Sequence, residues 1–467
     1  MAKRKILLMS DDLRMSSGVG TVSREVVFGT LDHYDWFQVG GAINHPEEGK
    51  LVDLSEELQK DTGIKDAYLK IFPVSGYGNQ ELARDIIAEE KPDAILHYTD
   101  PRFWGWLYQM EHEIRQQMPI FYYNVWDDLP YPRYNEFFYE SCDLIMNLSK
   151  QTWNIVNNCA VKKPRTDWDC TYIPHGINDT QFYKISELHD EWDEFENFRN
   201  NALKDMDINF IVLWNSRNIR RKVPGDVVLA YKTFCDMLPK EDADKCALVM
   251  HTQPVDENGT DLPALVSAVC PDYKVFFSED KLDNKHMNFL YNMADVTMLI
   301  SSNEGFGLSP AESHMAETPT ILNVTGGPQD QCGFRLKGEL LLEKHYSEIH
   351  SLHDDRKWKN NPDLTHGDWV KPVWPSNRSL VGSVPTPYIF DDRCRFDDVA
   401  DRLKEWYDTS IEERERCGAL AREFVMDPKV GQSVGEMCRR FKADMDRVFD
   451  KWKPRKRFTL FGTQEII

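Results

Sequence analysis

The sequence SSNEGFGLSPAE at residues 301–312 decides the expected fold. The six residues before it, DVTMLI at 295–300, form a short apolar and partly β-branched run that predicts a buried strand. Ser309 followed by Pro310 predicts the start of a helix, with Ser309 as the N-cap and Pro310 in the first helical position. The glycines therefore fall in a strand-to-helix turn, which presents backbone N–H groups and the positive end of a helix to an anion such as phosphate.

Two carboxylates flank this turn, Glu304 at its start and Glu312 in the first helical turn. Carboxylates accept hydrogen bonds from hydroxyl groups, so a phosphate-binding turn with two of them suits a nucleotide sugar. The local pattern has a second interpretation. Ser309 and Glu312 have the spacing of a capping box, in which Glu312 would fold back onto the N-cap amide and bind no ligand.

The same stretch resembles the E-x7-E signature of retaining glycosyltransferases of the GT-B fold, a large family (glycosyltransferase family 4-like) that includes bacterial sugar transferases and sucrose synthases. The similarity extends upstream through residues 291–296 and downstream through residues 319–327, which end in a Gly-Gly turn. It implies an α/β fold of two Rossmann-like, doubly wound domains that face each other across a cleft. It also implies a C-terminal helix that crosses back to the first domain. The resemblance includes glycosyltransferases of the bacteriophage type.

The resemblance assigns roles to individual residues. Arg217 and Lys222 match the family's Arg and Lys that hold the donor diphosphate, and with Glu304 they are the expected catalytic residues. Glu304 is expected to bind hydroxyls of the donor sugar, and Glu312 the ribose hydroxyls. The remaining donor-binding residues implied are Gly18, Gly20, Gly305, Phe306, Gly307 and Leu308.

The residues themselves support an anion site near Arg217. Four cations fall within residues 217–222, directly before a helix predicted to begin at Pro224. Cations at a helix N-terminus oppose the local dipole, which indicates an anionic partner. The alternative is a solvated basic cluster, and Arg220 and Arg221 in particular fit an exposed surface equally well.

A second glycine-containing loop lies near the N-terminus. Residues 5–10 predict a buried strand, and Gly18 and Gly20 follow it at the start of a predicted helix. Strand, glycine loop and helix in this order are typical of a Rossmann-like half, although two glycines are fewer than the dinucleotide fingerprint needs. A tight turn that requires glycine is the alternative.

Aromatic-rich loops follow the predicted strands 94–98 and 120–124. Ligands bind at the carboxyl ends of strands in doubly wound sheets, so these loops are the expected acceptor site. The candidates are His97, Trp126, Asp127 and Asp128. Trp126 fits a core position equally well, and residues 126–128 stand where the family commonly has a His-Asp pair that contacts the donor sugar.

Composition limits the class of protein. The chain has 467 residues, of which 41% are hydrophobic and 28% charged, as in ordinary globular proteins. Its net charge of −21 opposes non-specific binding to nucleic acid or anionic membranes. Three features of the sequence predict a cytoplasmic protein. The ten cysteines lack C-x-x-C spacing, no apolar run has membrane-spanning length, and the N-terminus lacks a signal-peptide pattern.

The predicted organisation is a first, acceptor-binding domain at residues 1–190 and a second, donor-binding domain at residues 205–430. A polar stretch at about 333–368 is longer than the family needs and is expected to be an inserted loop or hairpin, as a lid or an acceptor contact. Residues 431–467 are expected to form the crossover helix and a basic tail.

The function expected from these patterns is a retaining, metal-independent sugar transferase that needs no cofactor besides its nucleotide-sugar substrate, UDP- or GDP-linked. The acceptor stays open between a glycan, a protein, a lipid carrier and a hydroxylated DNA base. The alternatives are a nucleotide-sugar epimerase of the same architecture, a non-catalytic binding protein, and a metal-dependent transferase of the GT-A type. The last would use Asp167 and Asp169, which form a D-x-D pattern.

Overall fold

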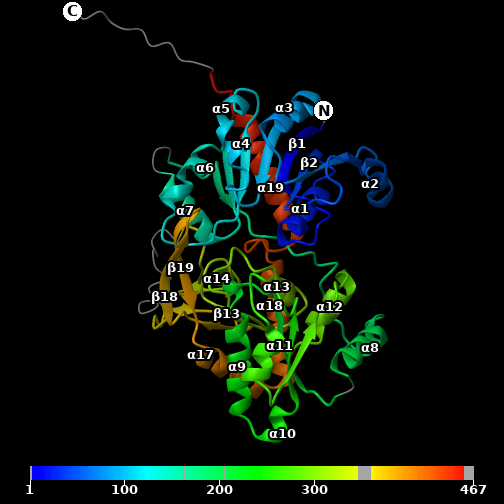
Figure 1. Ribbon diagram of the computed structural model, residues 1–467, viewed down its shortest axis with the longest axis vertical. Coiled ribbons are helices and arrows are strands. Elements are labelled where there is room, and N and C mark those ends of the chain that lie inside the picture. Colours follow the sequence, from blue (N-terminus) through cyan, green and yellow to red (C-terminus); the bar gives the residue numbers. More distant parts are fainter. Residues whose placement is uncertain (1–2, 161–163, 205, 345–358, 457–467) are drawn as a thin grey trace, which may run out of the picture.

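The computed structural model describes residues 3–160, 164–204, 206–344 and 359–456. These residues form two α/β domains that lie one above the other (Figure 1). Each domain is built around a largely parallel sheet with helices between successive strands, so the expected class of two doubly wound domains is confirmed. The predicted tail lies partly outside the described residues, since these end at residue 456.

The first domain contains an eight-stranded sheet in the order β3-β4-β2-β1-β5-β6-β7-β8. All of its strand pairs are parallel except β3 with β4. Helices cover both faces, which explains why the central strands read as continuous apolar runs. The strands are β1 Arg4–Asp11, β2 Tyr34–Ala42, β3 Val52–Asp53, β4 Leu69–Ser75, β5 Ala94–Tyr98, β6 Ile120–Asn124, β7 Leu144–Asn147 and β8 Cys170–Tyr172.

The helices of this domain connect consecutive strands. They are α1 Gly18–Phe28, α2 Ser55–Thr62, α3 Gln80–Glu90, α4 Gly105–Gln109, α5 Glu111–Ile114, η1 Arg133–Asn135, α6 Glu136–Glu140 and α7 Lys150–Cys159.

The second domain contains a six-stranded parallel sheet in the order β11-β10-β9-β12-β13-β17. Its strands are β9 Phe210–Asn215, β10 Cys246–His251, β11 Lys274–Ser278, β12 Val296–Leu299, β13 Thr320–Asn323 and β17 Val370–Val373. Its helices are α8 Trp192–Leu203, η2 Arg220–Lys222, α9 Pro224–Asp236, α10 Lys240–Ala243, α11 Leu262–Val269, α12 Asn284–Asn292, α13 Leu308–Met315, α14 Pro328–Gln331, α17 Phe396–Asp408 and α18 Ile411–Met426.

Two additions leave the regular pattern of the second domain. The described part of the stretch 333–368 forms a small sheet from β14 Arg335–Leu336, β15 Glu339–Leu340 and β16 Leu364–Thr365, and residues 345–358 lie outside the described residues. None of its described residues lines the cleft between the domains, and its role as a lid or acceptor contact stays a prediction. The addition that reaches the cleft is a hairpin that the sequence did not reveal, β18 Asn377–Ser383 and β19 Thr386–Arg393.

The last helix, α19 Val434–Lys451, returns to the first domain as expected and lies beside it in Figure 1. The Tyr34 hydroxyl donates a hydrogen bond of 2.8 Å to Asp446 on this helix. Where the chain crosses between domains, the outgoing and returning segments touch, and a Cβ at Gly176 would lie 2.5 Å from the Cα of Val434. Only glycine fits there.

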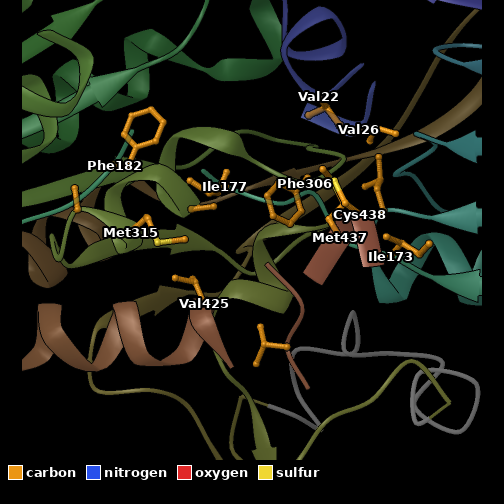
Figure 2. Packing of buried hydrophobic residues seen from close by; sticks show 14 of the residues in the cluster. Val22, Val26, Ile173, Ile177, Phe182, Phe306, Met315, Val425, Met437 and Cys438 are labelled. Carbon is orange, nitrogen blue, oxygen red and sulfur yellow. The ribbon is translucent and has the colours of Figure 1, made fainter. Parts of the chain in front are cut away.

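One hydrophobic cluster crosses the joint between the domains (Figure 2). It contains Val22 from the first domain, Ile177 from the connection, Phe306 from the second domain and Met437 from α19. A shared core makes the joint part of the folded structure rather than a loose linker. All ten cysteines are free, Cys394 half-buried and the others buried. Within the described residues, none of the helices is both long and apolar enough to span a lipid bilayer.

Candidate functional site

A cleft of about 1190 Å³ lies between the two domains. The first domain contributes the loops that follow β1, β5 and β6, and the second domain contributes the end of β9, the turn before α13 and the β18–β19 hairpin. Carboxyl ends of parallel strands from both sheets therefore meet at one place, as expected for open α/β sheets.

The turn between β12 and α13 forms one wall of this cleft. Helix α13 begins at Leu308, and its N-cap is Gly307 at φ 86°, a left-handed conformation that favours glycine. The predicted N-cap at Ser309 is therefore wrong, because glycine lets the chain turn into the helix earlier. Among the described residues no side chain caps this helix, and Gly307, Leu308 and Ser309 at its start line the cleft. A helix N-terminus in such a place can bind an anion.

A second glycine turn supports the first one from behind. The amide of Gly327 donates a hydrogen bond of 2.9 Å to the carbonyl oxygen of Glu304. A Cβ at Gly326 would clash with that same carbonyl, and a Cβ at Gly327 with the carbonyl of Gly305. The two glycines are required because two backbone turns pack directly on each other.

Glu304 lies at the centre of the second-domain wall. Its Oε2 accepts hydrogen bonds from the Lys222 ammonium and, at 3.1 Å, from Nη1 of Arg221. The carboxylate and the ammonium side chain each expose 11% of their surface, so this is a largely desolvated ion pair. Burial would raise the pKa of Glu304, but the two cations outweigh it and hold the pKa at about 2. The group stays ionised over the whole physiological range.

Arg221 belongs to this network, although its side chain is 41% exposed. Its Nη1 also donates a 2.9 Å hydrogen bond to the carbonyl of Asn303, and its own carbonyl accepts one of 2.8 Å from the amide of Ser302. Arg217, which the family resemblance favoured, lies at the rim instead. Its side chain is 65% exposed and pairs with Asp256 at 3.1 Å, although it still lines the cleft.

Glu312 does not form a capping box. Its carboxylate accepts a 2.6 Å hydrogen bond from the hydroxyl of Tyr291 on α12, which in turn accepts one of 2.8 Å from Asn215 at the end of β9. Burial raises the pKa of Glu312, and the Tyr291 hydrogen bond opposes this effect. Glu312 lines the cleft and keeps further acceptor capacity for a ligand hydroxyl. Neither Tyr291 nor Asn215 was predicted as a site residue from the sequence.

The two N-terminal glycines serve different purposes. Helix α1 begins at Gly18, and its N-cap Ser17 accepts a hydrogen bond from the amide of Gly20. Gly18 lines the cleft, and a Cβ there would lie 3.4 Å from Leu308 of the second domain. Gly20 does not line it. A Cβ at Gly20 would lie 2.6 Å from the carbonyl of Met15, so this glycine is required by a tight turn, which was the alternative interpretation.

The loop after β6 forms the opposite wall of the cleft, in the first domain. Trp126, Asp127 and Asp128 line it, and the Trp126 indole donates a 2.8 Å hydrogen bond to the carbonyl of Asp128. Trp126 is mainly a packing residue, since it is 7% exposed. The backbone of the loop is held from behind by Gln151 and by Thr152, whose hydroxyl donates to the Trp126 carbonyl at 2.6 Å.

The carboxylates of this loop are electrostatically unusual. Burial raises the pKa of Asp127 to about 6; the charge of Arg221 opposes this shift and that of Glu304 adds to it. Asp128 has its pKa raised well above the ordinary range by burial and by the neighbouring charges of Asp127 and Asp392. Two carboxyl groups that interact so closely titrate as a pair and hold a proton near neutral pH.

His97 is not part of this site. It lies in the core of the first domain, where its Nδ1 is 2.7 Å from the Tyr108 hydroxyl and its ring stacks on Tyr122. It does not line the cleft, because β5 directs its side chain to the opposite side of the sheet from the neighbouring Tyr98. The histidines that do line the cleft are His175 and His251. The Nδ1 of His175 is 2.7 Å from the Tyr123 hydroxyl. Burial lowers its pKa to about 3, so the ring is neutral.

The D-x-D pattern is structural. Asp169 is buried and accepts hydrogen bonds from the amide and hydroxyl of Thr166, at 2.7 and 2.9 Å, in the turn before β8. Asp167 is exposed and, like Asp169, lies outside the cleft lining. In the described part of the chain, no group of three His, Cys, Asp or Glu side chains is arranged to hold a metal ion.

Comparison with solved structures decides the fold. HepE from Anabaena, in complex with UDP and glucose, superposes with a TM-score of 0.63 at 12% identity, over 95% of this chain and 99% of that one. Sucrose-phosphate synthase from Thermosynechococcus elongatus superposes with a TM-score of 0.64 at 15% identity, over 96% of this chain and 100% of that one. The chain has the GT-B fold. The E. coli trehalose-6-phosphate structure bound with UDP-2-fluoro glucose is a further GT-B neighbour, with a TM-score of 0.61 and 14% identity over 97% and 100%.

The GT-B resemblance inferred from residues 291–327 is therefore confirmed at the level of the fold. No protein-family model matches the chain, and no curated protein matches its sequence. Within this GT-B fold, the second domain carries Glu304, Lys222, Arg221 and Glu312 at the cleft. The first domain carries Asp127 on the opposite wall.

Proposed function

We propose that this protein is a glycosyltransferase that moves a sugar from a nucleotide-sugar donor to a hydroxyl acceptor. One observation carries the proposal: a buried carboxylate, Glu304, is held between Lys222 and Arg221 beside the uncapped N-terminus of α13, inside the interdomain cleft of a GT-B fold. Two cations and a helix N-terminus suit a diphosphate, and carboxylates beside them suit the hydroxyls of a sugar.

The donor would bind mainly to the second domain. Lys222, Arg221 and the amides of the turn before α13 would neutralise the leaving diphosphate as its charge develops. Glu312 would accept hydrogen bonds from the ribose, and Glu304 from the donor sugar. Arg217 would reach the outer phosphate oxygens from the rim. UDP or GDP is the expected nucleotide, and the UDP ligands of the HepE and E. coli structures support the first.

We further propose that the reaction retains the anomeric configuration and needs no metal ion. The resemblance to retaining transferases supports retention, with the departing phosphate oxygen taking the acceptor proton. The cations at Lys222 and Arg221 supply the positive charge that a divalent ion provides in other transferases. The acceptor would be a glycan, a protein, a lipid carrier or a hydroxylated DNA base, and Asp127 and Asp128, which line the cleft, would contact its hydroxyl.

A donor screen tests the proposal. Thermal shift with UDP-, GDP- and ADP-glucose identifies the nucleotide. The stabilising sugar donor is then incubated with a glycan, a protein, a lipid carrier or hydroxylated DNA as the acceptor, and the products are followed by NMR. Release of free nucleotide with an α-linked product supports a retaining transferase. A new nucleotide sugar in place of free nucleotide would mean an epimerase, and absence of both binding and turnover with every donor would reject the proposal.

The same assay tests metal independence. Turnover is expected to persist in excess EDTA. Loss of activity on chelation, restored by manganese, would contradict the assignment of the charge-neutralising role to Lys222 and Arg221.

A further inference from the structure

The β18–β19 hairpin belongs to the second domain by sequence, since it connects β17 to α17. In space it lies at the boundary, beside the first domain (Figure 1). Interfaces between domains are mobile by default unless they are large or specifically tied. The contacts of this hairpin tie the two walls of the cleft together.

On the first domain, the hairpin binds the loop that directly follows Asp128. The amide of Phe390 donates a 2.7 Å hydrogen bond to the carbonyl of Leu129. The Tyr388 hydroxyl donates to the carbonyl of Tyr131 at 3.2 Å, and the Tyr134 hydroxyl donates to the carbonyl of Tyr388 at 2.9 Å. The rings of Tyr134 and Tyr388 meet edge to face with centroids 5.0 Å apart.

On the second domain, the base of the hairpin binds the residues that directly precede Glu304. The amide of Asp392 donates a 2.9 Å hydrogen bond to the carbonyl of Ser302, and the Ser302 hydroxyl donates to Asp391 at 3.1 Å. The Thr325 hydroxyl donates to the Asp392 carboxylate at 2.8 Å. One hairpin thus holds the backbone next to the carboxylates of both walls.

The face of the hairpin between these contacts is part of the cleft. Val381, Thr386 and Ile389 line it. Thr386 also accepts a hydrogen bond from Arg102, which pairs with Asp100 on the loop after β5. The hairpin is therefore positioned to narrow the acceptor side of the cleft as well as to connect its walls.

We propose that the β18–β19 hairpin is a positioning clamp, with Tyr388 as its key residue, that sets the separation of Asp127 and Asp128 from Glu304 and Arg221. Its catalytic consequence rests on the proposed function, whereas its effect on domain separation does not. The physical reason is that reacting groups must be held in a narrow range of distances, and a misplacement of about 1 Å can cost about a hundredfold in rate.

Tyr388→Ala tests the clamp, because it removes the ring contact and both hydrogen bonds of the hydroxyl, the one donated to the Tyr131 carbonyl and the 3.2 Å bond accepted from the Arg133 amide. In the absence of ligand, we expect a larger radius of gyration by small-angle X-ray scattering and faster amide exchange in residues 129–134. UDP affinity is expected to change less than about twofold, because the cations that would bind it lie on one domain. Turnover of UDP-glucose is expected to fall about ten- to a hundredfold in kcat with little change in KM.

Two further variants make the test specific. Tyr388→Phe keeps the ring and the fold, and we expect it to show the same exchange effect at smaller amplitude. Val384→Ser lies at the fully exposed tip of the hairpin and should match the wild type in every measurement.

If a folded Tyr388→Ala protein shows the same radius of gyration and the same amide exchange as the wild type, the clamp is overturned. A parallel loss of UDP affinity would also overturn it, since the hairpin would then shape the donor site. If even the wild type neither binds UDP nor consumes UDP-glucose, the donor proposed above is wrong, and scattering and exchange still decide the clamp.

Discussion

The negative charge of Glu304 stabilises the folded protein without a ligand, because it pairs with Lys222 and Arg221. Its pKa of about 2 lies below its ordinary value of 4.5, so the stabilisation from its ion pairs is present above pH 4.5 and is lost as the pH falls toward 2. At neutral pH the carboxylate of Glu304 forms an ion pair with the ammonium of Lys222. A diphosphate that binds at Lys222 must therefore share that cation with Glu304.

Glu304→Gln should lower the free energy of unfolding by about 3 kcal/mol, because it leaves the largely desolvated ammonium of Lys222 without its partner. UDP should restore part of this loss, so the UDP-induced rise in Tm should be larger in the variant than in the wild type. Glu405→Gln, which breaks ion pairs at a 40% exposed side chain, is the control; we expect it to cost less than about 1 kcal/mol and to leave the UDP effect unchanged. A smaller UDP effect in Glu304→Gln would contradict competition for Lys222.

The contribution of Asp127 to the stability of the fold should change with pH in the opposite direction to that of Glu304. Its pKa is raised from 3.8 to about 6, so its charged form disfavours the folded state, by an amount that grows from pH 3.8 to 6 and is complete above 6. Asp127→Asn should therefore raise Tm at pH 7.5, with a gain on the order of 1 kcal/mol, and raise it much less at pH 4.5. The exposed Asp167→Asn is the control and should change neither value. An equal gain at both pH values would argue against the titration of Asp127.

At the scale of single elements, helices α12 and α13 together orient Glu312, the carboxylate proposed to bind the ribose. Glu312 on α13 is kept in position by Tyr291 on α12, and Asn215 at the end of β9 holds the tyrosine hydroxyl. Three elements thus orient one carboxylate, and the orientation depends on hydrogen bonds rather than on charge.

Glu312→Gln should weaken UDP binding about tenfold, because a carboxylate accepts stronger hydrogen bonds from hydroxyls than an amide does. Tyr291→Phe should weaken it by a smaller factor, since it releases Glu312 without removing it. Isothermal titration with UDP checks both, and UMP should show the same ratios because it shares the ribose. A loss of stability without a change in affinity would show that Glu312 has only a structural role.

At the scale of the whole molecule, the two domains share part of their core at the joint. Met437 on α19 is completely buried in the cluster that also contains Phe306 and Ile177. The joint is therefore stabilised by apolar packing, in addition to the contacts of the β18–β19 hairpin.

Met437→Ala should lower the free energy of unfolding by about 2 to 5 kcal/mol, the usual cost of such a truncation in a core. Because the cluster spans both domains, calorimetry should show the destabilisation in the unfolding of both. Met426→Ala, at a 37% exposed position at the end of α18, should cost less than about 1 kcal/mol. Destabilisation confined to one domain would mean that the joint does not couple them.

The sequence by itself determined the alternation of strands and helices and the turn at residues 301–312. These features depend on apolar periodicity and on glycine and proline, which act within a few residues of each other. It also placed Glu304, Glu312 and Lys222 correctly at the cleft. It did not predict the start of α13 at Leu308, because Gly307 at positive φ replaces the expected serine cap.

Only the tertiary structure decided which neighbours of these residues matter. The sequence left Arg221 open between a surface and a site position, and in the structure it binds Glu304. It made His97 an acceptor candidate, and His97 lies in the core. Lys222 and Glu304 are 82 residues apart, and the hairpin contacts that connect Tyr388 with Tyr134 span 254 residues. Burial, ion pairing and hydrogen bonds between distant segments depend on how the two sheets face each other, and local sequence patterns carry no information about that.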